Sequence, residues 1–465
     1  MLYIVPSAAQ NLTSFEQVSP SVDYSAEELK LGRQFMRGAF KQLDYSRDPE
    51  LTTYIESLGN KIVEGAGVAK EKFSFFLVNN PNLNAFAAPG GYITLHTGLL
   101  AHTATESELA SVVGHEVAHI TQRHLPRMIE RARQRSLPAA AAMVAAILVG
   151  GQLGSAALVS ANAAMAADQL RYSRDFEREA DSVGLRLLAS SGFSPADMPK
   201  FFTKLHKQSS LSSVSVPEYL RSHPLSINRI AATEARAIDY PATALKPSMS
   251  FMHLKERAEV LAEQAAGRVM EYTPVSDYAD VKERSVAYGN LLRAIRNTDY
   301  ALALELVEKL LQFDADNYYY LLAKGQLWMA ENKYSEAIDE FSLIKSIYPS
   351  RPEPVFYLVR AQIAATDYKD ARKTLRQWMR QNPDSAIAWS ILSRIEGELG
   401  NLVAAFQARA EYFDLLFDPK RALHELIQAR KHAEGNFYLT SSIEARELEL
   451  NEDMRRFGEL EQLQN

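Results

Sequence analysis

A regular step of about 34 residues, kept at several positions of the C-terminal part of the chain, restricts its fold more than any other feature of the sequence. Two sets of positions keep this step, one mostly tyrosine and one entirely alanine: Tyr300, Tyr334, Tyr368 and Leu402, and Ala303, Ala337, Ala371 and Ala405. Pro349 and Pro383 keep it too. A small residue at one place in each unit lets two helices approach closely, and a proline ends the second helix of the pair. The pattern predicts an α-solenoid of stacked helix pairs over about residues 284–417.

Other positions in the same stretch indicate the type of repeat. Gly325, Phe341 and Trp389 stand where a helix–turn–helix unit of this length carries glycine, phenylalanine and tryptophan, so this region resembles the tetratricopeptide (TPR) repeat family. Ala422 follows Ala405 after only half of that step, so the register slips there, and we expect one more helix pair with a cap. Stacked repeats form an extended concave surface that suits the binding of a partner. A generic helical bundle is the alternative.

Composition sets the broad class of protein. The 465 residues suggest two or three domains, and 47% apolar with 23% charged residues is ordinary for a soluble globular chain. The 51 basic and 57 acidic side chains give a net charge of −6, which argues against nucleic acid as a partner. The chain has no cysteine, so disulfides, thiolate metal ligands and cysteine nucleophiles are excluded.

The strongest local signal is the motif His115-Glu-Val-Ala-His119. Thr105-Glu-Ser-Glu108 fits a capping box, which predicts a helix that begins near Thr105 and runs through the motif. The two histidines are four residues apart and therefore share one helix face, where they can bind one Zn²⁺ ion. Glu116 lies beside them and is placed to take a proton from a water that the metal activates. Two surface histidines on a helix are the alternative.

A hydrolytic zinc site needs a third protein ligand and an open position for water. A second helix is expected over Asp168–Ser190, and it carries Glu177 and Asp181 four residues apart on one face. We assign Glu177 to the metal and Asp181 to a hydrogen bond with a ligand imidazole, which fixes the tautomer of that ring. Glu179 lies about 200° round the helix from Glu177 and is expected to face solvent. Without the histidine motif, this acidic cluster would be read as a solvated helix face.

The order H-E-V-A-H followed by E-x-x-A-D resembles the zinc endopeptidases of the HtpX and CAAX-prenyl-protease type. The family's other matching segments flank the active helix: Asn84–Ala87, Pro89–Gly91, Gly98-Leu99, and Ser222–Leu225 with Arg229. The resemblance covers about residues 24–235 and implies a mainly α, gluzincin-type metallopeptidase domain with a small β-sheet beside the cleft. With the repeats added, the chain resembles periplasmic members of the family that survey the assembly of outer-membrane β-barrel proteins.

The same resemblance gives roles to two more residues. His223 would be a displaceable fourth ligand of the zinc ion that closes the site when no substrate is present, and the alternative is a loop histidine before a proline. Arg229 would hold a positive charge near the developing oxyanion, and the alternative is a structural ion pair. His124 lies about 140° round the helix from His119 and is not expected to bind the metal.

Short strands are expected ahead of the active helix, over residues 73–78 and Tyr92–His96, after a helix-like stretch at 24–60. The Tyr92–His96 strand would align an extended substrate by pairing at its edge. Asn84, Tyr92 and Thr94 are therefore the expected substrate-binding residues.

Two segments bear on where the protein resides. Ser7-Ala8-Ala9 looks like the end of an export signal, but no basic region precedes it, so we expect an incomplete signal, with a cytosolic N-terminus as the alternative. Residues 136–167 carry no charge and are rich in alanine and glycine. We expect a helical hairpin there, with peripheral membrane contact or insertion as alternatives, because no strictly apolar piece is long enough to span a bilayer.

The patterns together predict four segments: an N-terminal segment with the signal end at 1–23, a zinc metallopeptidase domain at 24–235, a helical connector at 236–282 and TPR repeats at 283–465. We predict a zinc-dependent endopeptidase with one Zn²⁺ per chain and a chaperone-like role beside it. From the resemblance, its partners are misfolded or stalled outer-membrane β-barrel proteins, and the repeats bind these clients or the barrel-assembly machinery. The alternatives are a repeat scaffold with little proteolysis and an integral membrane zinc protease.

Overall fold

The computed structural model describes residues 22–134, 163–211, 217–241, 247–268 and 271–457. Within these ranges the fold is mainly helical with one small sheet, and a helical repeat region follows, which confirms the predicted fold class. The expected export-signal end and most of residues 136–167 lie outside the described residues. Among the described helices, none combines the length and the apolar character needed to cross a membrane.

Two helices form where the sequence shows one helix-like stretch at its N-terminal end. α1 (Ala26–Gln42) starts with a complete capping box between Ser25 and Glu28. α2 (Pro49–Gly65) starts with Asp48 as N-cap, whose carboxylate accepts from the first backbone N–H groups. A short 3₁₀ helix, Lys70–Lys72, leads into the sheet.

Three strands make the sheet in the described part of the chain: β1 (Ser74–Val78), β2 (Ala85–Ala88) and β3 (Tyr92–His96), in the order β1-β3-β2. β3 pairs in parallel with β1 and antiparallel with β2. Gly90 and Gly91 join β2 to β3 with φ angles of 84° and 85°, a conformation that glycine adopts without strain. The prediction that the Tyr92–His96 strand aligns substrate at its edge is wrong, because both sides of β3 are already paired.

The helices that carry the predicted zinc ligands follow the sheet. α3 (Thr97–His102) leads to α4 (Glu106–Thr121), α5 (His124–Gln134) and the long α8 (Ala163–Ser190). Thr105 caps α4 by accepting from the Glu108 N–H, but the Glu108 carboxylate accepts from the Ala104 N–H, one residue before the position of a capping box. α4 and α8 pack against each other where Gly114 faces Gly184.

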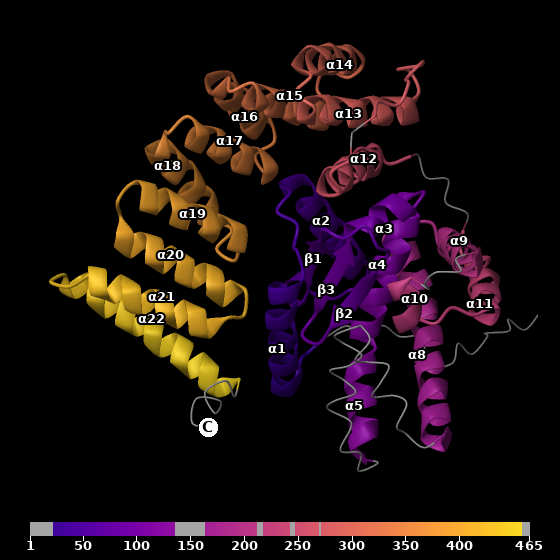
Figure 1. The fold of residues 1–465 in the computed structure, drawn as a ribbon. Coiled ribbons are helices and arrows are strands. Elements are labelled where there is room, and N and C mark those ends of the chain that lie inside the picture. The colour runs from indigo at the N-terminus through magenta and orange to yellow at the C-terminus, as the bar shows by residue number, and fades with distance from the viewer. Residues whose placement is uncertain (1–21, 135–162, 212–216, 242–246, 269–270, 458–465) are drawn as a thin grey trace, which may run out of the picture.

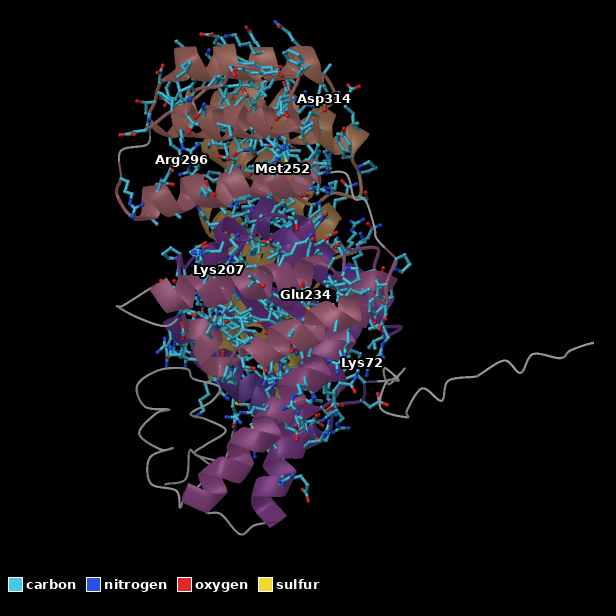
Figure 2. All side chains as sticks on the ribbon, turned by 90° about the vertical axis from the view of Figure 1, so that its right-hand side faces the viewer. Lys72, Lys207, Glu234, Met252, Arg296 and Asp314 are labelled. Carbon is cyan, nitrogen blue, oxygen red and sulfur yellow. The ribbon has the colours of Figure 1, made fainter. Side chains whose placement is uncertain are left out.

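Four more helices complete this part. α9 (Asp197–Leu211), α10 (Glu218–Ser222) and α11 (Ile227–Ala237) cover the active helices, and α12 (Met249–Ala265) packs on α2 and α3. Figure 2 shows this order, with Lys207 of α9 and Glu234 of α11 below Met252 of α12 and with Arg296 and Asp314 of the repeats above it. The hydrophobic core continues from the sheet through α12 into the first repeat helices, so α12 is not a loose linker.

The repeat region begins with α13 (Val281–Arg296). Its further helices are α14 (Tyr300–Phe313), α15 (Tyr318–Ala330), α16 (Tyr334–Ile347), α17 (Glu353–Ala364), α18 (Tyr368–Met379), α19 (Ala386–Glu398), α20 (Leu402–Leu415), α21 (Pro419–His432) and α22 (Phe437–Arg456). The predicted step is visible in the backbone, because α14, α16, α18 and α20 start at the four positions of the first periodic set. The turns before them repeat as well, each with one residue at positive φ: Thr298, Asn332, Thr366 and Gly400.

The repeats form an arc that runs from α13 round to α22, beside α1 (Figure 1). The far end of the arc reaches the first helix, where Arg33 lies 3.9 Å from Asp414 and over the Phe417 ring. Phe417 also packs against Tyr92 of β3, with ring centroids 5.2 Å apart. The arc and the sheet side of the first domain enclose a cavity of about 2340 Å³.

A buried cluster joins the two parts at the near end of the arc. Arg257 of α12 lies 2.7 Å from Asp48 and 3.0 Å from Glu50, both at the start of α2. The Arg257 guanidinium also donates to the Tyr357 hydroxyl of α17 at 2.7 Å. These four residues, called the joint cluster below, tie together helices that are far apart in the sequence.

Candidate metal centre and active site

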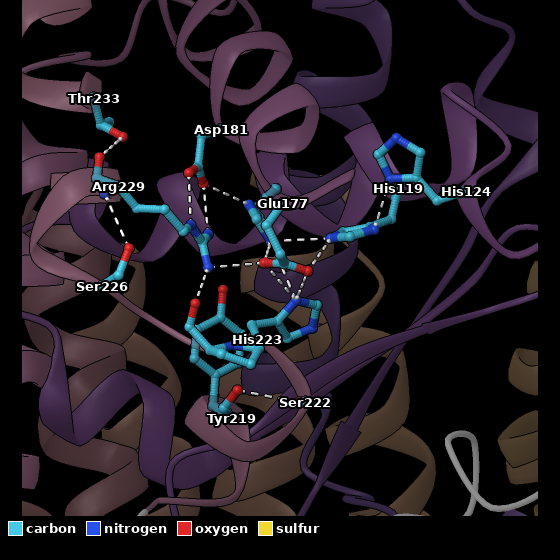
Figure 3. A network of polar contacts seen from close by, with 12 residues as sticks. His119, His124, Glu177, Asp181, Tyr219, Ser222, His223, Ser226, Arg229 and Thr233 are labelled. Carbon is cyan, nitrogen blue, oxygen red and sulfur yellow. Dashed lines mark hydrogen bonds and ion pairs between the residues drawn. The ribbon is translucent and has the colours of Figure 1, made fainter. Parts of the chain in front are cut away.

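The packing of α4 on α8 brings the predicted metal ligands together. His115 and His119 project from one face of α4, with their Nε2 atoms 3.0 Å apart. Glu177 of α8 faces both rings, with one oxygen 3.4 Å from His115 Nε2 and the other 3.5 Å from His119 Nε2. His115 and Glu177 are buried and His119 is partly buried, and Figure 3 shows Glu177 facing the His119 ring.

His223 completes the group from the residue after α10. Its Nδ1 atom lies 3.3 Å from His115 Nε2 and 3.1 Å from a Glu177 oxygen. One donor atom from each of the four residues lies within 4.8 Å of the others. Zinc bonds of about 2.0–2.1 Å in a tetrahedron place the ligand atoms about 3.3 Å apart. The five separations given above are 3.0–3.5 Å, close to this value, and the donor atoms of His119 and His223 lie within the 4.8 Å limit, so the cluster is compact enough to hold one zinc ion.

Two further charged residues, Asp181 and Arg229, contact this group. Asp181 lies 3.2 Å from His115 Nδ1, on the ring edge opposite the donor group. Arg229 donates to both Asp181 oxygens at 2.8 and 2.7 Å, and its third nitrogen lies 2.9 Å from Glu177. Arg229 therefore forms the structural ion pair that the sequence analysis gave as the alternative to a role near the oxyanion.

The groups around Glu177 and Asp181 keep both of these buried carboxylates ionised. Burial opposes the charge of Glu177, but His223 and His115 outweigh it and hold the Glu177 pKa well below its usual value. Burial likewise opposes the charge of Asp181, and the bonds from Arg229 and His115 hold its pKa low. Burial lowers the pKa of His119 well below its usual value, which keeps that ring neutral. Burial opposes the charge of His115, but Asp181 and Glu177 outweigh it and raise its pKa to about 9. Because a metal binds neutral imidazole and ionised carboxylate, metal binding displaces a proton from His115.

Glu116 differs from the other carboxylates of the site. Its side chain is 1% exposed, and burial raises its pKa. It lies 3.5 Å from His223 Nε2, and the Ala87 N–H of β2 donates to it. A carboxyl group with a raised pKa beside the metal ligands suits proton transfer near neutral pH.

The structure separates the three expected substrate-binding residues. Tyr92 packs on Phe417 and lines the cavity between the sheet and the repeats, so its role with substrate stays a prediction. Thr94 is fully buried in the middle strand of the sheet, so its predicted contact with substrate is wrong. Asn84 immediately precedes β2, the strand that donates to Glu116, and its role stays a prediction.

The sequence analysis gave no role in the site to two polar residues that lie beside it, His124 and Glu179. His124 lies with its Nδ1 2.9 Å from His119 Nδ1, and Glu179 lies 3.3 Å from His124 Nε2. The prediction that Glu179 faces solvent is wrong, since its side chain is 24% exposed and paired. The angle expected between His119 and His124 assumed one continuous helix, whereas α4 ends at Thr121 and Arg123 turns the chain with a φ of 55°. His124 is not among the four metal-facing donors, as expected.

A pair of helices that presents two histidines, a glutamate and an adjacent proton acceptor defines a metalloprotease. A model of peptidase family M48 matches residues 49–237. A Vibrio cholerae relative is 31% identical over 469 residues, which cover 98% of this chain and 96% of the relative. The beta-barrel assembly-enhancing protease of Escherichia coli K12 is 31% identical over 450 residues, 93% of this chain and 89% of that protein. The chain belongs to the M48 beta-barrel assembly-enhancing proteases, which confirms the resemblance.

A further relative is similar over about half of this chain. The mitochondrial metalloendopeptidase OMA1 of Arabidopsis thaliana is 29% identical over 238 residues, 47% of each chain. The likeness to the bacterial proteins, in contrast, extends across the repeats.

Proposed function

We propose that this chain is a zinc-dependent endopeptidase that holds one Zn²⁺ ion through His115, His119 and Glu177. The observation that carries the proposal is the convergence of these donors at tetrahedral separations, with Glu116 next to them. A bound zinc ion would act as a Lewis acid and lower the pKa of a water bound to it from 15.7 to about 7.

The chain's own residues divide the remaining work. Glu116 takes a proton from the attacking water and then delivers it to the leaving amine. Asp181 fixes the His115 tautomer, and Arg229 neutralises Asp181 and Glu177 so that both stay charged in a buried place. Arg229 thus acts on the ligands rather than on the oxyanion.

An extended substrate pairs along β2 in this proposal. Within the described residues β2 pairs with no strand other than β3, and on its other edge the Ala87 N–H donates to Glu116, so a substrate paired there lies next to the proton acceptor. Backbone pairing at a strand edge aligns a peptide without regard to most of its side chains. Asn84, at the start of this strand, contacts the same substrate.

His223 holds the site closed at rest. Its Nδ1 occupies the fourth ligand position, and its Nε2 lies toward Glu116, so both the water position and the proton acceptor are covered. Substrate entry requires the short segment after α10 to move. Replacing His223 with Ala should raise basal cleavage of an unfolded protein, and unchanged or lower activity would contradict this role.

We further propose that the clients are misfolded or stalled outer-membrane β-barrel proteins in the periplasm. The support is the likeness to proteins named for β-barrel assembly across nearly the whole chain. The TPR-type arc is suited to hold a client or the barrel-assembly machinery, since its cavity is lined by aromatic side chains from both parts, among them Phe75, Phe76, Trp378 and Tyr412. A chaperone-like role accompanies proteolysis.

The decisive experiment replaces Glu116 with Gln. The variant should lose cleavage of an unfolded barrel protein but keep one zinc per chain by metal analysis, because the side chain is not a ligand. A His115→Ala/His119→Ala variant is the control and should lose both. Cleavage that persists in the Glu116→Gln variant would refute the assignment of the proton acceptor, and a wild-type chain without zinc would refute the metal site.

A further inference from the structure

Each metal-facing histidine has a second ring nitrogen, and the partner of that nitrogen decides how the ring is held. For His115 the partner is Asp181, which was expected. For His119 it is His124, whose Nδ1 lies 2.9 Å from His119 Nδ1. A donor and an acceptor must meet across this distance, so only one of the two nitrogens carries hydrogen.

The proton positions follow from the metal-facing role of His119. Its Nε2 must be free of hydrogen to face the metal, so its Nδ1 carries the hydrogen and donates to His124. His124 Nδ1 then accepts, and its own hydrogen sits on Nε2. That atom lies 3.3 Å from a Glu179 oxygen, which is the acceptor this tautomer requires.

The surroundings fix the His124 ring in this orientation. The ring stacks on Phe176 of α8, with centroids 4.3 Å apart and planes 19° from parallel. Arg127 lies 2.9 Å from Glu179 and over the same Phe176 ring, so the carboxylate is held and neutralised. The turn at Arg123, with its positive φ, brings His124 back toward His119.

The two ligand histidines are therefore supported alike. His115 contacts Asp181, which Arg229 contacts in turn. His119 contacts His124, which contacts Glu179, and Arg127 contacts Glu179. In both cases a polar group lies next to the second ring nitrogen, and an arginine balances the charge of the carboxylate behind it. We propose that His124 is a positioning residue that, together with Glu179, orients His119 for metal binding and raises the affinity for zinc. This inference rests on the proposed zinc site.

The test measures zinc affinity by competition with a chromogenic chelator, on the full chain. His124→Phe keeps the stacked ring but removes both nitrogens, and it should bind zinc about 10- to 100-fold more weakly, as for other supporting partners of metal-bound histidines. His124→Asn places a carbonyl oxygen near the position of Nδ1 and should recover most of the loss. Glu179→Ala should weaken binding by less than His124→Phe does.

A matched control comes from the same helix as Glu179. Arg178 is exposed and pairs with Asp175, three residues before it, so Arg178→Ala should bind zinc as the wild type does. Thermal unfolding of the metal-free proteins checks that the variants fold. A cobalt-substituted sample adds a spectroscopic readout, because the visible absorption of Co²⁺ changes when a ligand ring turns.

The outcomes separate this inference from the proposed function. A wild-type chain that binds no zinc removes both. A wild type that binds zinc, with a His124→Phe variant of equal affinity and the same cobalt spectrum, overturns the role of His124 and leaves the zinc site intact. If His124→Phe does not fold, the zinc affinities of His124→Asn and Glu179→Ala decide. The proposal requires a near wild-type affinity for His124→Asn and a weaker one for Glu179→Ala. Equal affinities in the two variants overturn it.

Discussion

The joint cluster allows a sharp prediction about how the two parts of the chain are held together. Replacing Arg257 with Met keeps most of the apolar length of the side chain but removes the guanidinium. Asp48 keeps its two backbone donors, the N–H groups of Glu50 and Leu51 at 3.1 and 3.0 Å. Glu50 loses its cation and keeps hydrogen bonds from Tyr357 and Gln326. The cost therefore falls mainly on Glu50, whose side chain is fully buried.

Breaking a buried ion pair by removing one partner costs about 3–5 kcal/mol, because the other charge is left without compensation. Burial already raises the pKa of Glu50, so part of this cost is relieved by protonation, and we expect about 3 kcal/mol. The assay is urea unfolding followed by tryptophan fluorescence, since Trp328, Trp378 and Trp389 all lie in the repeats. Hydrogen exchange in α2 reports the other side of the joint.

A double variant tests the cause. Adding Glu50→Gln to Arg257→Met removes the uncompensated charge and should recover about half of the lost stability. The exposed Arg178→Met variant is the control and should change stability by less than about 0.5 kcal/mol. A loss of unfolding free energy below about 1 kcal/mol for Arg257→Met, or no recovery of it in the double variant, would show that the joint cluster does not stabilise the contact between the two parts.

Two further predictions concern stability. Burial and the neighbouring Glu259 raise the pKa of Glu256 to about 7 from 4.5, so the folded chain holds a proton that the unfolded chain releases, and stability falls as pH rises from 4.5 through 7. Glu256→Gln should therefore stabilise the protein by up to about 3 kcal/mol at pH 8 but not at pH 4, as thermal melting will show, and an equal effect at both pH values contradicts this. In α1, a Cβ at Gly32 would clash with the Pro89 carbonyl oxygen whereas one at Gly38 meets nothing, so Gly32→Ala should lower and Gly38→Ala should slightly raise the melting temperature, and equal shifts would refute this reasoning.

Local patterns of the sequence predicted most of the fold. The helix starts at Tyr300, Tyr334 and Tyr368 follow the predicted step because each repeat contacts mainly its neighbours, so local pattern and structure share one period. The four-residue spacings in α4 and α8 likewise place His115 with His119 on one helix face and Glu177 with Asp181 on another. The structure brings these two faces together, with Glu177 3.4 Å and Asp181 3.2 Å from His115.

What the sequence could not predict depends on contacts between distant residues or on single backbone turns. The pairing of β3 with two neighbours is set by strands that meet in space, so the edge position expected for Tyr92–His96 was wrong. The place of His124 behind His119 was missed because one left-handed residue, Arg123, ends a helix that the spacing treated as continuous. Arg257 and Asp48 are 209 residues apart in the sequence, and no periodicity links them.

The contact between the first helix and the last repeats has a consequence for biosynthesis. Arg33 leaves the ribosome hundreds of residues before Asp414, so α1 cannot make its final contacts until translation is almost finished. Closing a loop of this length costs about 5 kcal/mol of chain entropy, which the arc can repay only after most of its repeats are stacked. The contact between α1 and the end of the arc should therefore form last during folding. A chain truncated before Phe417 should leave α1 and the aromatic face of the sheet open to solvent.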